Sequence, residues 1–196
     1  MVKKTLFLTT FIMTIFTAVA AHGQSNDVYI EQVGDALNLV VNQTGDSNNV
    51  GGIDSDFTLE GDNIDISIDQ TGDGNSIDGQ IVKADGVIAS IETVGNANQF
   101  DVNMGATGDV TDSTVDVTIT GDTNVVDLTT GPDNSAIGAD IDIAIAGSEN
   151  QMTSIIDSDT AVLNADVDGD LNIINTTQEG WSDNSITMAL SGSDNQ

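Results

Sequence analysis

Apolar and polar residues alternate along most of the chain, in short runs that end at regularly spaced glycines. Counting back from seven of these glycines, the positions four and six residues earlier are always apolar, whereas the residues between them are mainly polar or small. Alternation with a period of two predicts β-strands with one buried face. The seven reference glycines, which recur at similar intervals, are Gly45, Gly72, Gly95, Gly121, Gly147, Gly169 and Gly192.

Asparagine occupies the third position after every reference glycine. These asparagines are Asn48, Asn75, Asn98, Asn124, Asn150, Asn172 and Asn195. A second apolar strand is predicted to begin just after each of the first six. It runs to a less regular second turn, which we place near Gly34, Gly61, Gly86, Gly108, Gly131, Ser158 and Gly180. Each unit is therefore strand, turn, strand, turn.

Two short strands cannot bury an apolar face by themselves, so the pattern favours the stacking of successive units. We predict an all-β fold: a two-sided β-solenoid of about seven strand-turn-strand rungs around a narrow core. The glycines are expected where the backbone needs a positive φ. The asparagines are expected to lie one above another and to exchange side-chain hydrogen bonds, as in cross-β stacks. An antiparallel sandwich also uses short strands and Gly-rich turns and is the alternative fold.

The N-terminal segment, 1–23, differs from the rest of the chain and is typical of a secretory signal peptide. Lys3 and Lys4 precede an uncharged apolar stretch, and Ala18-Val19-Ala20 supplies small residues at the spacing of a cleavage site. The alternative is an N-terminal membrane anchor, for which the stretch is short. We predict a signal peptide over 1–23 and one solenoid domain over 24–196, with no membrane insertion after cleavage.

Charge and composition exclude several functions. Among 196 residues there are 32 acidic side chains and no cysteine, and Lys83 is the only Lys or Arg after residue 4, so residues 24–196 carry a net charge of −31. Nucleic acid is excluded as a partner because it is bound through Lys and Arg. Without cysteines, disulfides cannot stabilise a secreted form. We expect no enzyme, since basic groups and a cleft-forming insertion are both missing from the sequence, and we expect no cofactor or metal site.

Part of the chain resembles the curlin repeat. Gln43-Thr44-Gly45-Asp46-Ser47-Asn48 and Gln70-Thr71-Gly72-Asp73-Gly74-Asn75 are similar to its Gln-x-Gly-x-x-Asn core, and Gln32 precedes Gln43 by eleven residues, as in paired strands of that repeat. The resemblance implies curlin-type glutamines at Gln32, Gln43 and Gln70. It also implies a curli-like amyloid architecture.

The resemblance further implies a function. Curlins are secreted subunits that polymerise on the outer surface of Gram-negative bacteria into amyloid fibres for biofilm matrix and adhesion. We therefore expect a cell-surface fibre subunit that adds to itself head to tail, with a nucleator subunit and an outer-membrane export pore as candidate partners. The alternative is a monomeric secreted acidic β-solenoid that binds calcium or acts as an adhesin.

Overall fold

The computed structural model describes residues 2–9, 15–22, 26–51, 57–95, 97–105, 110–131, 136–179 and 183–196. These residues form nineteen β-strands and no helix. In chain order the strands are β1 (Val2–Thr9), β2 (Ile15–His22), β3 (Asn26–Val33), β4 (Leu37–Thr44), β5 (Ser47–Gly51), β6 (Phe57–Glu60), β7 (Asp65–Thr71), β8 (Gly74–Asp85), β9 (Ile88–Val94), β10 (Ala97–Met104), β11 (Val110–Thr111), β12 (Thr114–Thr120), β13 (Thr123–Thr130), β14 (Ala136–Ile137), β15 (Asp140–Ala146), β16 (Glu149–Asp159), β17 (Val162–Asp168), β18 (Ile173–Glu179) and β19 (Ser185–Ser191).

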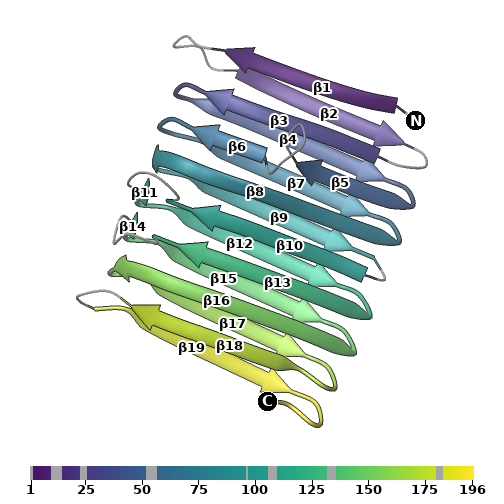
Figure 1. The fold of residues 1–196 in the computed structure, drawn as a ribbon, viewed down its shortest axis with the longest axis vertical. Coiled ribbons are helices and arrows are strands. Elements are labelled where there is room, and N and C mark those ends of the chain that lie inside the picture. Colours follow the sequence, from purple (N-terminus) through teal and green to yellow (C-terminus); the bar gives the residue numbers. More distant parts are fainter. Residues whose placement is uncertain are drawn as a thin grey trace.

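The strands form two parallel sheets that run the length of the molecule (Figure 1). The first sheet, which we call sheet 1, contains β1, β3, β5, β8, β10, β13, β16 and β18, with the short β6, β11 and β14 beside them. The second, sheet 2, contains β2, β4, β7, β9, β12, β15, β17 and β19. Because the chain alternates between the sheets and always advances in one direction, each pair of strands is one rung. The predicted β-solenoid of about seven rungs is confirmed, and the antiparallel sandwich is wrong because the strands pair in parallel.

The alternating pattern of the sequence becomes alternating burial. Along β12 and β15, for example, every second residue is buried. Strand pairing places Ile141, Ile143 and Ile145 in columns with inward residues of the rungs before and after them. Inward side chains from both sheets form one continuous apolar core. Within it, Phe57 lies over Gly79, where an added Cβ would meet the phenyl ring at 2.0 Å. The missing side chain of Gly79 therefore makes room for the ring.

The reference glycines are required mainly because successive turns stack closely. This corrects the prediction that they are needed for a positive φ. Of the seven, only Gly45, Gly169 and Gly192 have a positive φ. A Cβ on Gly72, by contrast, would lie 1.6 Å from the carbonyl oxygen of Gly45, and one on Gly147 would lie 1.8 Å from that of Gly121. These turns pass so near the turns below them that no side chain fits between them.

The second turn is built differently from the prediction. One residue per rung adopts a left-handed conformation, with φ between 46° and 70°. These residues are Ala36, Asn63, Gly86, Asp112, Gly138, Thr160 and Asp183. Of the predicted positions, Gly86 is one of these residues, and Gly34, Gly61 and Ser158 lie just before one. The turn predicted near Gly131 is wrong, because Gly131 directly follows β13 and lies well before Gly138, where the turn is. The turns predicted near Gly108 and Gly180 lie outside the described residues.

The predicted signal peptide falls partly on described backbone. β1 pairs in parallel with β3, and β2 with β4, so residues 2–9 and 15–22 continue the solenoid by one rung. The cleavage that we expect, after Ala20, Ala21 or Gly23, stays a prediction. Were it to occur, β3 and β4 would become the first strands of sheets 1 and 2.

Candidate functional site

Six hydrogen bonds join the asparagines that follow the reference glycines. In each, Nδ2 of one asparagine donates to Oδ1 of the asparagine one rung further along the chain, over 2.7–2.9 Å. We call this column the asparagine ladder; its members are Asn48, Asn75, Asn98, Asn124, Asn150, Asn172 and Asn195. All except Asn195 are buried. Every amide that donates within the ladder points the same way, with its donor toward the C-terminal rungs.

Asn124 shows how the ladder is tied to the backbone. Its Nδ2 donates to the carbonyl oxygen of Gly121 in its own turn at 3.1 Å and to that of Ala146 in the next rung at 3.3 Å. Since buried polar atoms need partners, the ladder satisfies carbonyl groups of the tight turns and its own amides together. The ladder thereby holds successive turns in register.

The strand register places an eighth asparagine at the ladder position, one rung before the seven that were predicted. Asn26 pairs with Asn48 through the backbone, which places Asn26 at the ladder position of the β3 rung. In the sequence Asn26 is the third residue after Gly23, the same offset as in the other rungs. That offset was visible in the sequence, but Gly23 stood inside the predicted signal peptide.

The curlin-type glutamines lie in both sheets. Gln43 and Gln70 are neighbours in sheet 2 and are fully buried, and their Nε2 atoms donate to the carbonyl oxygens of Asn49 and Ser76. Their Oε1 atoms have no hydrogen-bond partner among the described residues. Gln32 is in sheet 1, where its backbone pairs with Leu59. In the C-terminal rungs aliphatic residues replace the glutamines, so the core becomes less polar toward β19.

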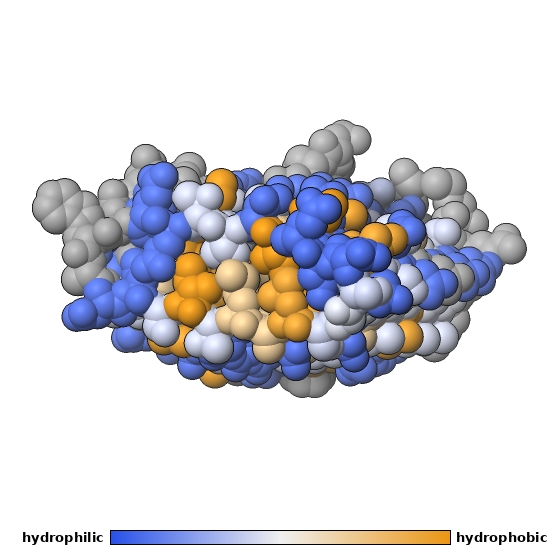
Figure 2. Space-filling view, turned by 90° about the horizontal axis from the view of Figure 1, so that it is seen from below, coloured by the Kyte–Doolittle hydropathy of each residue, from blue (hydrophilic) through white to orange (hydrophobic). Residues whose placement is uncertain are grey.

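The C-terminal end of the stack is apolar and accessible. Among the strands of the described residues, β18 and β19 each have a neighbour on one side only. Inward residues that are buried in other rungs are partly exposed here: Met188 is 44% exposed and Leu190 is 40% exposed. Figure 2 looks at this end along the stack and shows apolar side chains in its middle, framed by hydrophilic ones. The end presents a cross-section of the core together with exposed strand edges.

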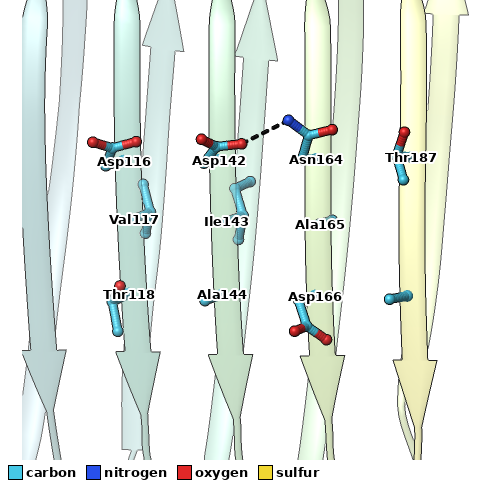
Figure 3. Close-up of a pocket in the computed structure, with 11 residues that line it drawn as sticks. Asp116, Val117, Thr118, Asp142, Ile143, Ala144, Asn164, Ala165, Asp166 and Thr187 are labelled. Atoms are coloured by element: carbon cyan, nitrogen blue, oxygen red, sulfur yellow. Dashed lines mark hydrogen bonds between the residues drawn. The ribbon is translucent and has the colours of Figure 1, made fainter.

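Acidic side chains form rows on the outer faces. In sheet 1, Asp78, Asp101 and Asp127 occupy the same position in three successive rungs. In sheet 2, Asp116 and Asp142 are neighbours, and Oδ1 of Asp142 accepts a hydrogen bond of 2.8 Å from Asn164. The residues of this second row border a shallow hollow of about 560 Å³ on the outer face of sheet 2 (Figure 3). No group of three or more His, Cys, Asp or Glu residues that could hold a metal ion occurs in the described part of the chain.

One carboxylate has a shifted pKa. The backbone N–H and the hydroxyl of Ser193 both donate to Oδ1 of Asp170 at 2.9 Å, and these hydrogen bonds lower the pKa of Asp170 below its ordinary value. The contact joins the last two reference turns. It therefore ties the C-terminal turn to the rung before it.

No protein-family model matches the chain, and the searches of curated proteins and solved structures also gave no match. The resemblance to curlins therefore stays a prediction based on the motifs of two rungs. Within the described residues, no helix is long and apolar enough to cross a membrane. The class that the fold defines is a parallel, two-sided β-solenoid with a buried asparagine ladder.

Proposed function

We propose that this protein is a secreted subunit of a curli-like amyloid fibre, which serves a bacterial surface in biofilm matrix and adhesion. The observation that carries the proposal is the exposed core at the end formed by β18 and β19. Soluble solenoids normally cover such an end with a polar cap, because unpaired strand edges pair with other chains. An end that repeats the spacing of the interior accepts another rung.

Addition of a second copy would be stabilised by the same interactions that stack the rungs. Each added rung forms backbone hydrogen bonds along two strands and buries inward apolar side chains, and the asparagine ladder can continue across the contact. A contact between two different ends of identical subunits does not close on itself, so it generates a filament. The proposed partner is therefore another copy of this chain.

The charge opposes assembly and sets its conditions. Two carboxylates one rung apart repel by roughly 0.9 kcal/mol in bulk water, and rows such as Asp78, Asp101 and Asp127 repeat this repulsion along the stack. The interaction is short-ranged at physiological salt, where the Debye length is about 8 Å. Assembly is therefore expected to need salt, acid or divalent cations.

The direct test is electron microscopy of purified residues 24–196, with thioflavin fluorescence, in the presence and absence of calcium. At high salt, unbranched filaments that bind thioflavin are the expected result both with and without calcium. A chain that stays monomeric at high salt and at low pH would contradict the proposal. Folding of a monomer only in the presence of calcium would instead favour a calcium-binding solenoid.

A further inference from the structure

The two outermost strands of sheet 2 in the proposed mature chain lack carboxylates. β7, β9, β12, β15 and β17 each carry at least one Asp or Glu, whereas β4 and β19 carry none. In a chain with 32 acidic residues, these two uncharged strands stand at opposite ends of the stack once the predicted signal peptide is removed. Neither would repel a strand placed against it.

We propose that the β3–β4 rung of one copy docks on the β18–β19 end of another in a single register, and that the absence of carboxylates from the two sheet 2 strands, β4 and β19, selects this joint. The inference rests on the proposed function and specifies its contact. In this register two apolar inward residues of β4 meet apolar residues of β19: Leu39 lies over Ile186 and Val41 over Met188. The exposed apolar side chains of the C-terminal end are thereby covered.

The same register avoids carboxylate pairs in sheet 1. Following the strand pairings from β18 back to β3, Glu31 falls in the column of Thr177. The place of Asp27, in the column of Ile173, is already taken by Gln196, so this carboxylate does not pair with β18. The acidic residue of β18, Glu179, follows Gln178, and the column of Gln178 leads back to Gln32 rather than to a carboxylate. Inside the stack, by contrast, aspartates face aspartates from rung to rung. The joint is therefore less repulsive than several of the contacts within one subunit.

The asparagine ladder gives the joint a direction. Each Nδ2 donates toward the C-terminal rungs, so the two ends of the ladder differ, and the last amide, Asn195, is half-buried. The C-terminal residue Gln196 already pairs beside β18: its N–H donates to the carbonyl of Asn172, and its carbonyl accepts from the N–H of Ile174. Asn195 and Gln196 thus fill the positions that the first two residues of a docking β3 would otherwise take. The docking copy therefore pairs from Val28 onward.

Two variants, each blocked at one end, test the joint. Val41 and Met188 occupy equivalent inward positions, four residues before Gly45 and Gly192, and both become end residues in the chain 24–196. Val41→Lys and Met188→Lys each place a charge in the joint, at one end only. Asn42→Lys and Ala189→Lys are the matched controls, because they add the same charge at the neighbouring exposed, outward positions.

Each blocked variant alone is expected to remain a single subunit by analytical ultracentrifugation, under conditions in which the wild-type chain and both controls form filaments. An equimolar mixture of the two blocked variants is expected to give particles of twice the subunit mass and no larger, because only one pair of compatible ends is left. Circular dichroism and urea unfolding establish that each variant is folded. If Val41→Lys does not fold, Gln43→Lys blocks the same end, because Gln43 lies opposite Leu190 in the proposed register.

Dimers of Val41→Lys alone, with none added by mixing, would show that C-terminal ends pair with each other and would overturn the joint. Elongation of either blocked variant at the rate of its control would also overturn it. Both results leave the proposed function standing, since the wild-type chain still forms filaments. Wild-type chains that form no filaments would overturn the proposed function and the joint together.

Discussion

Replacement of Asn124 by alanine tests whether the asparagine ladder holds the rungs together. Asn124 is fully buried and makes the equivalent of three hydrogen bonds: its two amide hydrogens are shared among acceptors of Gly121, Ala146 and Asn150, and its Oδ1 accepts from Asn98. At about 1 kcal/mol for each bond, with about 1–3 kcal/mol for a buried acceptor left without a donor, and allowing for partial relaxation, we expect a loss of about 3–5 kcal/mol in the free energy of unfolding.

In this variant Oδ1 of Asn150 and the carbonyl oxygen of Gly121 both lose the amide of Asn124, whereas the carbonyl of Ala146 keeps the N–H of Gly121. Nδ2 of Asn98, by contrast, retains the carbonyls of Gly95 and Thr120. Asn164→Ala is the control, because Asn164 is exposed and donates a hydrogen bond only at the surface, to Asp142. The free energy of unfolding of Asn164→Ala is expected to fall by less than about 1 kcal/mol. Urea unfolding of monomeric 24–196 at low salt, followed by circular dichroism, measures both values. If the two losses are equal within experimental error, the ladder does not stabilise the stack as argued.

Asn124→Asp removes the amide hydrogens without removing side-chain volume. It therefore separates these two contributions to the destabilisation expected for Asn124→Ala. The carboxylate keeps the shape but turns an oxygen toward the carbonyls of Gly121 and Ala146, so its pKa in the folded chain is raised above that in the unfolded chain. Its penalty is therefore present at neutral pH and declines as the pH falls through the raised folded-state pKa. Relative to the unsubstituted chain, the variant should regain stability in acid, and a pH-independent penalty would refute the reasoning.

Three further outcomes are expected. Gly147→Ala should prevent close stacking and lower the free energy of unfolding, measured in urea, by several kcal/mol, because its Cβ would lie 1.8 Å from the carbonyl oxygen of Gly121. Gly74→Ala should be tolerated, since its Cβ meets nothing nearer than 4.0 Å. Equal effects of the two substitutions would contradict the steric argument. Ser193→Ala should raise the pKa of Asp170 part of the way to its ordinary value, because the hydroxyl is lost and the backbone N–H stays; an NMR titration that finds no change would contradict this. Fibre elongation, measured by thioflavin fluorescence, should accelerate as salt is raised from about 0.01 M to 1 M, where the Debye length falls from about 30 Å to 3 Å; elongation fastest at low salt and pH 8 would refute the electrostatic account.

The reference turns could be predicted from sequence because all their signals are local. Gly121 and Asn124 keep the offset seen in the other rungs, and the apolar positions before the glycine keep a period of two, so the strand and the turn follow from one rung and the ladder position from the recurrence of the offset. The reason for the glycine could not be predicted in this way. The obstruction at Gly147 is the carbonyl of Gly121, which belongs to the preceding rung and becomes a neighbour only after stacking.

The second turn carries a weaker signal. Ala36 and Thr160 adopt left-handed φ values without being glycine or asparagine, so composition does not mark them. Gly131, which does have a positive φ, suggested a turn in the wrong place. The unpaired Oε1 atoms of Gln43 and Gln70 were also beyond prediction, because they depend on how each amide is oriented against the neighbouring rung.

The sheet 1 segment varies in length from rung to rung. Five residues separate Met104 from Val110, whereas β8 crosses the equivalent position with two residues and β16 with one. The fold thus tolerates added sequence at this point, while the glycine turns on the opposite edge admit none. A foreign peptide grafted between Met104 and Val110 should therefore leave the scaffold intact, and a polymer of such chains would present that peptide once per subunit, as an ordered display array.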